Sequence, residues 1–350
     1  LFWIDGRYSY SDANGGIVKV VVPKGDVMAN PDLTWEQTSS WNVGVDFGFW
    51  KNRLNGNIDF YAKKTKNLLL RRDLAGSTGY NCAYYNSGSL TNTGVEVTLE
   101  GIVFDSKDLS WSLRGNLGLN RSKICDLGAE IEPSEYGNLG KHVGYYGNKL
   151  AADVFGVGHV FLEGMAPGLF FGYKSQGIIQ EKDVRVDDDG ITKWISYVGK
   201  DGKVAEYMAS KDHGSQRAGD VKYVDTNGDG KISKEDCEII GDPNPGFTYG
   251  FGTTLRYKGV QLSMSFNGVH GRDILNLNRR YYATPSDAAG NARGNITYDT
   301  YNNIWSPTNP TGTAPARTYA VANEVNDRYV EDGSYLRCSD ITLTWNMPKS

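Results

Sequence analysis

Twelve residues near the middle of the chain have the residue types and spacing of a calcium-binding loop. The segment runs from Asp225 to Asp236 and reads DTNGDGKISKED. Oxygen-bearing groups stand at positions one, three, five, seven and twelve, and a glycine stands at position six, where such a loop turns sharply. The predicted ligands are the side chains of Asp225, Asn227, Asp229 and Asp236 and the main-chain carbonyl of Lys231. Because Ca²⁺ prefers oxygen ligands, this pattern predicts a structural Ca²⁺ site.

Two features of this segment differ from the usual calcium-binding sequence. The last ligand is Asp236 where a bidentate glutamate is usual. The preceding residues 221–224, VKYV, predict an extended segment where a helix is usual. The alternative is therefore a polar loop rich in Asp and Asn that binds no metal. A sensor role is not expected, because no flanking pair of helices exists to open.

Strict alternation of apolar and polar residues predicts the strands around this loop. In residues 41–49 the odd positions are Trp, Val, Val, Phe and Phe, and the even positions are Asn, Gly, Asp and Gly. After a break at 50–53 the alternation resumes over 54–62, so the two segments predict a hairpin. The same unit recurs at 95–100 with 111–120 and at 249–257 with 260–267, and a last strand is expected at 341–345.

Short turns and long segments alternate along the chain. The long segments are 63–93, 121–168, 174–246 and 271–334. Structureless connections of more than about 12–15 residues are uncommon in compact soluble domains. Outer-membrane barrels, in contrast, have short periplasmic turns and long extracellular loops. The expected fold class is therefore all-β, a segment of a transmembrane antiparallel β-barrel with short periplasmic turns and long extracellular loops.

The two faces of the predicted strands differ in chemistry. The polar faces carry charges that suit a water-filled lumen, namely Asp46, Asp59, Glu96, Glu100, Arg114 and Arg256. Aromatic residues stand near strand ends, as in the girdles of membrane barrels, at Trp41, Trp50, Tyr61, Trp111, Tyr257 and Trp345. The apolar faces would then contact outer-membrane lipid. The alternative is a soluble or cell-surface β-sandwich that binds carbohydrate, in which the apolar faces meet in a core.

Composition excludes several classes of protein. The 350 residues include 37 Lys and Arg against 41 Asp and Glu, a net charge of −4, which gives no electrostatic footprint for nucleic acid. No apolar run approaches the roughly 18 residues of a membrane helix. The four cysteines and four histidines lack metal-ligand spacing. A glycan-cleaving enzyme needs two carboxylates about 5–10 Å apart, and no such pair stands out. The prediction is a protein that is not an enzyme and has no catalytic residues.

Several motifs resemble the SusC/RagA-type TonB-dependent transporters. Residues 219–232 read GDVKYVDTNGDGKI, and IIGDPNP at 239–245 and FTYGF at 247–251 follow. The same family is indicated by NPDLTWE at 30–36, NTGVE at 92–96, GYKSQGI at 172–178, WSP at 305–307 and YVEDGSYLR at 329–337. The resemblance thus covers nearly the whole chain.

The resemblance implies that residues 1–350 are part of a TonB-dependent receptor β-barrel in the bacterial outer membrane. In this family a barrel of about 22 strands with an N-terminal plug imports oligosaccharides or peptides. The TonB complex supplies the energy, and a SusD-like surface lipoprotein caps the extracellular loops. The plug and the final strands are expected to lie outside these 350 residues. Residues 219–241 are expected to form an EF-hand-like calcium loop inside an extracellular loop.

Overall fold

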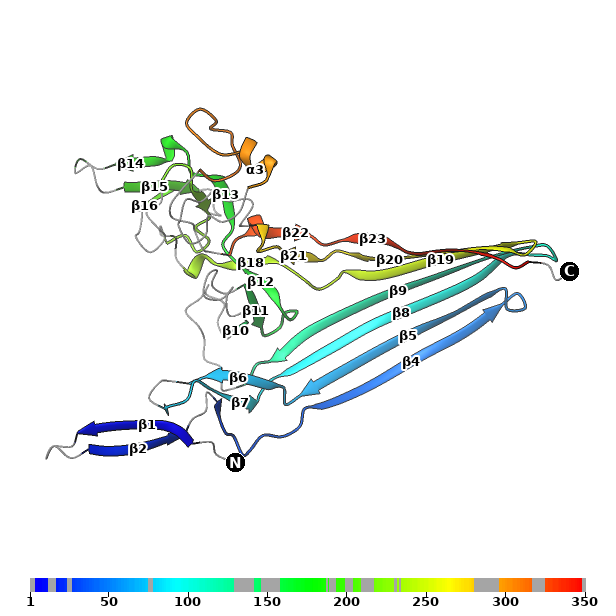
Figure 1. Ribbon diagram of the computed structural model, residues 1–350, viewed down its shortest axis with the longest axis horizontal. Coiled ribbons are helices and arrows are strands. Elements are labelled where there is room, and N and C mark those ends of the chain that lie inside the picture. Colours follow the sequence, from blue (N-terminus) through cyan, green and yellow to red (C-terminus); the bar gives the residue numbers. More distant parts are fainter. Residues whose placement is uncertain are drawn as a thin grey trace.

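The largest element of the computed structural model is a seven-stranded antiparallel sheet with the strand order β23-β20-β19-β9-β8-β5-β4. Its strands are β4 Gln37–Phe49, β5 Leu54–Lys66, β8 Ser89–Asp105, β9 Leu109–Asp126, β19 Phe247–Tyr257, β20 Val260–His270 and β23 Tyr335–Trp345. The structure describes residues 4–11, 17–23, 27–74, 78–128, 142–145, 158–186, 188, 193–198, 204–208, 217–229, 232, 234–279, 296–316 and 325–347. Figure 1 shows the long sheet extending away from a group of smaller sheets.

Three short turns join hairpins at one end of the sheet. Residues 50–53 join β4 to β5, with three consecutive non-glycine residues at positive φ, and 106–108 join β8 to β9. Lys258 and Gly259 join β19 to β20 with φ of 42° and 88°, as a two-residue type I′ turn requires. The three predicted hairpins are thereby confirmed. The observed strands are longer than predicted, because pairing of β4 with β5 continues without interruption from Gln37 to Phe49.

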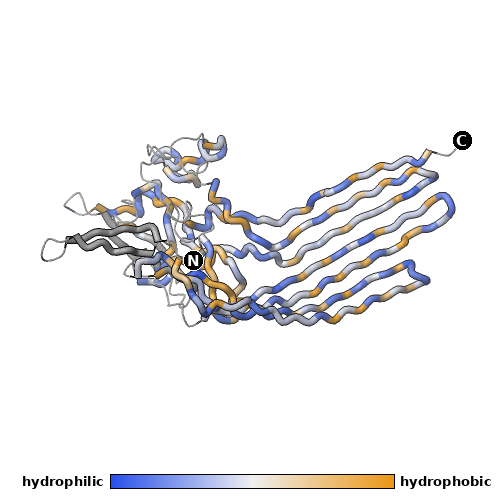
Figure 2. The backbone as a smooth tube through the Cα atoms, turned by 60° about the horizontal axis from the view of Figure 1, so that its bottom comes forward, coloured by the Kyte–Doolittle hydropathy of each residue, from blue (hydrophilic) through white to orange (hydrophobic). Residues whose placement is uncertain are grey.

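One face of this sheet is apolar and exposed. Figure 2 shows hydrophobic and hydrophilic residues alternating along the long strands. On β4 the side chains of Trp41, Val43 and Val45 are between 56% and 64% exposed. No second sheet within the described residues covers this face. The structure therefore contradicts the β-sandwich alternative, in which the apolar faces meet in a core, and agrees with a face that contacts lipid.

The two longest strands of this sheet, β8 and β9, exceed the length that a membrane crossing requires, whereas β19, β20 and β23 have 11 residues each. β8 has 17 residues and β9 has 18, whereas a tilted transmembrane strand needs about 9–11. Each long strand has one end at a short turn. The other end leads towards the smaller sheets (Figure 1). β8 and β9 therefore extend beyond the membrane at the end of the sheet where the long connections begin.

The long connections pack into a folded unit, which we call the loop assembly and define as the described residues of 158–186, 217–245, 296–316 and 325–332. Five of its strands are β11 His159–Leu162, β12 Leu169–Gly172, β13 Ser175–Ile178, β17 Val221–Tyr223 and β18 Glu238–Gly241, and β14 Val184–Val186 and β22 Val330–Asp332 also belong to it. β12 pairs with β18, and β13 pairs with β17, so both pairs join distant segments. A core that includes Val160, Phe171, Ile179 and Trp305 lies between these segments.

Smaller elements complete the described structure. The remaining strands are β1 Ile4–Ser11, β2 Ile17–Pro23, β3 Val27–Met28, β6 Leu69–Asp73, β7 Cys82–Asn86, β10 His142–Tyr145, β15 Lys193–Val198, β16 Val204–Met208 and β21 Asp273–Leu275. The short helices are α3 Tyr298–Asn302, η2 Glu181–Asp183, η4 Lys234–Asp236 and η5 Asp327–Tyr329. Across the described ranges, no helix has the length and apolar character that crossing a membrane requires.

Candidate functional site in the polar face and the loop assembly

A row of polar positions crosses the sheet on the face opposite the exposed apolar residues. The strand register places Asn55, Glu100, Arg114, Gly252 and Ser265 side by side on five consecutive strands. Glu100 and Arg114 are directly opposite each other on antiparallel strands, where unlike charges are favourable. Arg114 Nη2 donates a hydrogen bond of 2.7 Å to Ser265 Oγ. The polar face therefore presents hydrogen-bonding and charged groups, as the wall of a water-filled lumen does.

Glycines on the polar face let long side chains cross a neighbouring strand. Tyr61 lies directly opposite Gly94 and donates a hydrogen bond of 3.1 Å to Asn120 Oδ1 on the next strand. A Cβ atom on Gly94 would overlap the Tyr61 ring. Arg114 crosses Gly252 in the same way, because a Cβ atom there would lie 2.7 Å from Arg114 Nε. Side-chain hydrogen bonds thus link strands that are not paired with each other.

The predicted calcium loop joins β17 to β18 in the loop assembly. The extended segment expected at 221–224 is confirmed over Val221–Tyr223. Asp225 and Asp236 are buried, at 2% and 0% exposure. Asn227 and Asp229 are exposed, and Lys231 lies outside the described residues. The loop therefore has two predicted ligands buried at its base and two on its surface.

Hydrogen bonds fold the start of this loop onto its end. The carboxylate of Asp225 accepts from the Gly228 amide at 2.7 Å, and the carboxylate of Asp236 accepts from the Thr226 amide at 2.8 Å. The side-chain oxygen of Asn227 accepts from the amide two residues further on. No three His, Cys, Asp or Glu side chains of the described residues are grouped as they would be around a metal ion. The Ca²⁺ site therefore stays a prediction.

Hydrogen bonds also join distant segments inside the loop assembly. The buried Trp305 donates its indole N–H to Gln180 Oε1 at 3.0 Å. Asn326, which is 1% exposed, donates to the Tyr223 hydroxyl at 3.4 Å. Among these segments the sequence predicted structure only at 221–224, because none of their short strands alternates clearly. The interior of the loop assembly is thus specified by contacts between residues that are more than one hundred positions apart.

Three charged groups of the loop assembly have definite partners or environments. Lys222 Nζ lies 3.1 Å from a carboxylate oxygen of Asp183, and both side chains are largely buried. Partial burial lowers the pKa of the Arg328 guanidinium, which still stays charged at neutral pH. Hydrogen bonds from Ser334 lower the pKa of the exposed Asp332 carboxyl. The loop assembly thus contains one ion pair with largely buried side chains and two further ionisable side chains.

Two exposed aromatic residues on α3 were not singled out from the sequence. Tyr298 is 81% exposed and Tyr301 is 66% exposed. They are three residues apart on one helical turn, so their side chains project from the same side of the helix. The spacing YDTY was the available signal. Exposed tyrosines on a rigid turn are suited to contact with a partner protein or a substrate.

The fold and the two faces define a class of protein. An antiparallel sheet with one apolar and one polar face, short turns at one end and long folded connections at the other is the wall of an outer-membrane β-barrel. In comparison with known proteins, residues 4–346 match the family described as TonB dependent receptor-like, beta-barrel. The chain belongs to this family and is an outer-membrane protein.

Individual relatives agree with this assignment. TonB-dependent receptors P3 and P26 of Formosa agariphila are each 30% identical over 92% and 91% of the chain, respectively. TonB-dependent receptor SusC of Bacteroides thetaiotaomicron is 28% identical over 91% of the chain. The RagAB peptide importer in its closed-closed state matches 99% of the chain with a TM-score of 0.67 at 21% identity, which supports the fold. The resemblance to SusC/RagA-type transporters is confirmed.

The chain is shorter than the proteins that it matches. It spans 28% of the length of P3 and of P26, 26% of SusC and 32% of the matched RagAB chain. These relatives therefore contain large regions that have no counterpart in the 350 residues.

Proposed function

We propose that this chain forms barrel wall and extracellular loops of a TonB-dependent importer of oligosaccharides, with peptides as the second candidate substrate. The observation that carries the proposal is the seven-stranded sheet, which has an exposed apolar face, a polar face and the loop assembly at one end. The family match over residues 4–346 and the relative named SusC support the same function. Peptides are the second candidate because one structural neighbour is named a peptide importer.

In this proposal the polar face lines the route of the substrate. The row from Asn55 to Ser265 offers hydrogen-bond donors and acceptors to a hydrated solute. The protein acts by transport and not by catalysis. The TonB complex drives the movement of a plug domain, as the resemblance to SusC/RagA-type transporters implies. A SusD-like surface lipoprotein covers the loop assembly, where Tyr298 and Tyr301 are exposed on α3.

The loop at 225–236 binds one structural Ca²⁺ ion in this proposal. Two of its predicted ligands, Asp225 and Asp236, are carboxylates that are almost completely buried. Beside them, Thr226 Oγ1 is buried without a hydrogen-bond partner in the described residues. Buried polar atoms in native proteins generally have a partner, so a bound ion with its water is a fitting occupant. Asn227, Asp229 and the carbonyl of Lys231 complete the ligand set, and the ion stiffens the connection between β17 and β18.

Uptake by living cells tests the transport function. The transporter gene that encodes this chain is deleted, and cells are supplied with fluorescent oligosaccharides or fluorescent peptides of several lengths. The deletion is expected to abolish accumulation of one of the two classes, and a strain without TonB is expected to show the same loss. Unchanged accumulation of both classes in the deletion strain would reject the importer function.

Cysteine labelling separates a barrel from a soluble module. The exposed Cys125 and Cys338 are first replaced by serine in the full transporter polypeptide. A membrane-impermeant maleimide is then added to intact cells that lack the proposed lipoprotein and carry Tyr301→Cys in α3 or Lys107→Cys in the 106–108 turn. Labelling of the Tyr301→Cys variant alone is expected, because the short turns face the periplasm. Equal labelling of both variants would contradict a membrane-spanning sheet.

A further inference from the structure

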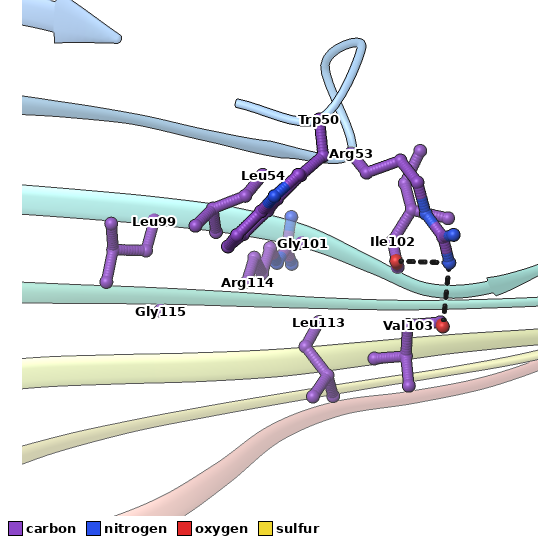
Figure 3. A pocket seen from close by; sticks show the side chains of 10 residues that line it. All are labelled: Trp50, Arg53, Leu54, Leu99, Gly101, Ile102, Val103, Leu113, Arg114 and Gly115. Atoms are coloured by element: carbon purple, nitrogen blue, oxygen red, sulfur yellow. Dashed lines mark hydrogen bonds between the residues drawn. The ribbon is translucent and has the colours of Figure 1, made fainter. Parts of the chain in front are cut away.

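A groove of about 600 Å³ lies on the apolar face of the sheet at its short-turn end. Leu54, Leu99, Leu113 and Val103 line it with aliphatic side chains from β5, β8 and β9 (Figure 3). These three strands are paired on both sides within the chain, because β4 flanks β5 and β19 flanks β9. The groove therefore lies on strands away from the edges of the sheet. Strands that would pair with β4 or β23 do not affect it.

Two glycines form the floor of the groove, and a Cβ atom at either position would overlap no other atom. A Cβ atom on Gly101 would have Leu54 Cδ1 as its nearest neighbour at 3.8 Å, and one on Gly115 would have Gly250 O at 3.8 Å. Elsewhere on the same face the glycines are covered. A Cβ atom on Gly56 would lie 2.6 Å from the Phe47 ring. The hollow over Gly101 and Gly115 thus lacks the aromatic cover that the sheet provides at Gly56.

A tryptophan and an arginine lie at the edge of the groove nearest to the turn. Trp50 is 73% exposed, and its ring extends from the turn beside Leu54 (Figure 3). Arg53 Nη2 donates to Ile102 O at 3.3 Å and to Val103 O at 3.0 Å. These two carbonyls lie where the β8–β9 register shifts at a β-bulge. The bonds use one nitrogen of the guanidinium, and the N–H groups on Nε and Nη1 have no partner among the described residues.

The position of the groove in the membrane indicates which parts of a lipid molecule lie beside it. Short turns of outer-membrane barrels face the periplasm, so the groove opens into the periplasmic leaflet of the bilayer. Tryptophan rings stand at the boundary between hydrocarbon and headgroups, which places Trp50 and Arg53 at phosphate depth. Guanidinium groups bind phosphate through paired N–H donors. The aliphatic floor then lies at the depth of the acyl chains.

We propose that this groove binds one glycerophospholipid of the periplasmic leaflet, with an acyl chain over Gly101 and Gly115 and the phosphate beside Arg53. The charge of Arg53 is complementary to a phosphodiester, and the lining of the groove is complementary to a hydrocarbon chain. A bulk annular lipid would need neither the hollow nor the cation. This inference concerns lipid binding and goes beyond import. Its test does not depend on which substrate the protein transports.

Native mass spectrometry of the full transporter polypeptide in mild detergent tests the site. The delipidated protein is titrated with dioleoyl phosphatidylethanolamine, and binding of one lipid is followed. Arg53→Gln is expected to weaken the first binding event at least tenfold, while Arg53→Lys, which keeps the charge, weakens it less. Lys51→Gln is the matched control, because it removes one positive charge from the same turn, and it is expected to change binding less than twofold.

A second pair of variants fills the hollow. Gly101→Val with Gly115→Val is expected to abolish the first binding event, since valine suits a strand and occupies the space of the chain. Folding of the barrel is checked on a gel, where a folded outer-membrane barrel gives a heat-modifiable band, that is, a band whose position changes after boiling. Retention of this band shows that the barrel has folded. If the double variant does not fold, Gly115→Ala replaces it, and a loss of binding of about threefold is expected. Glycerophosphoethanolamine, which has the headgroup without chains, is expected not to compete.

Several outcomes would overturn the proposal. Binding of phospholipid by Arg53→Gln and by the glycine variants as tightly as by the unmodified protein would show that the groove is not the site. Equal binding by Arg53→Gln and Arg53→Lys would remove the role of the charge. A third outcome is that a protein, and not a lipid, stays bound to the unmodified transporter and is absent from the same variants. This result would show that the groove binds a protein.

Discussion

The hydroxyl of Tyr61 on β5 donates to Asn120 Oδ1 on β9 at 3.1 Å, although β8 lies between these two strands. Neighbouring strands are about 4.8 Å apart, so the ring must cross a full strand. Gly94, directly opposite both residues, provides the open path. A second case occurs on the other face, where Tyr249 lies opposite Gly268 and a Cβ atom would lie 2.5 Å from its ring. Such pairs fix the strand register, because a shift by one residue would place a side chain under the ring.

Gly94→Ala is expected to lower the unfolding temperature of the full transporter. The added methyl group would overlap the Tyr61 ring and lie 2.6 Å from Leu119 O, and overpacking of this kind costs about 1–3 kcal/mol. Loss of the heat-modifiable band is followed over a temperature series. Gly101→Ala, on the same strand, is the control and is expected to change little, because its nearest atom would be 3.8 Å away. Equal losses in both variants would contradict the role of the Tyr61 ring.

Trp305→Phe is expected to loosen the loop assembly and leave the barrel intact. The variant removes the indole N–H and leaves Gln180 Oε1 without its 3.0 Å bond, at a cost of about 1–3 kcal/mol. Limited proteolysis should cleave the loop assembly faster, with the heat-modifiable band unchanged. Trp35→Phe is the matched control because Trp35 is 91% exposed. The same cleavage rate in both variants would show that the Trp305 contact does not hold the loops together.

Gly172→Ala is expected to separate two segments of the loop assembly. A Cβ atom on Gly172 would overlap the carbonyl of Val325, next to the bridge between Tyr173 and Asn326. Hydrogen exchange of amides in 169–173 and 325–329 should accelerate about tenfold or more, and exchange in β19 and β20 should not change. Gly158→Ala, whose nearest atom would be 3.5 Å away, is the control. Protection of 325–329 equal to that of the unmodified protein would refute the expected separation.

Asp229→Ala is expected to abolish Ca²⁺ binding by the full transporter, as measured by titration calorimetry after chelator treatment. Asp229 is exposed, so its removal should leave the fold intact. Asp32→Ala removes an exposed carboxylate from a distant turn and is expected to leave binding unchanged. Chelation should also speed proteolysis between β17 and β18 in the unmodified protein. Unaltered calcium affinity in the Asp229→Ala variant would show that the loop at 225–236 is not the Ca²⁺ site.

The long hairpins could be predicted because their information is local. Alternation from Trp41 to Phe49 and over 54–62 specifies which face each side chain occupies, and the intervening turn then specifies the register. The two-residue turn at Lys258–Gly259 likewise follows from neighbours in the sequence. A strand with one face towards lipid and the other towards water carries the strongest periodic signal that a strand can have.

The loop assembly could not be predicted, because its information is distributed along the chain. β12 is buried on both faces, so Leu169–Gly172 shows no alternation. Its partner β18 lies nearly seventy residues away, and Phe171 pairs with Ile239 across that interval. The calcium pattern was visible, and the burial of Asp225 and Asp236 agrees with a structured loop. The groove over Gly101 was invisible, because a hollow depends on what the neighbouring strands leave uncovered.

The excess length of β8 and β9 carries the ends of these two strands out of the membrane. About seven residues of each strand exceed what a crossing needs, and at about 3.4 Å per residue they add up to roughly 24 Å along the strand. With a tilt of about 40° this corresponds to about 18 Å of height. This protruding end of β9 is held against the loop assembly, because the Ile124 amide donates to Met165 O at 2.9 Å and the Gly164 amide donates to Ile124 O at 2.7 Å. The two strands therefore brace the side of the loop assembly outside the bilayer.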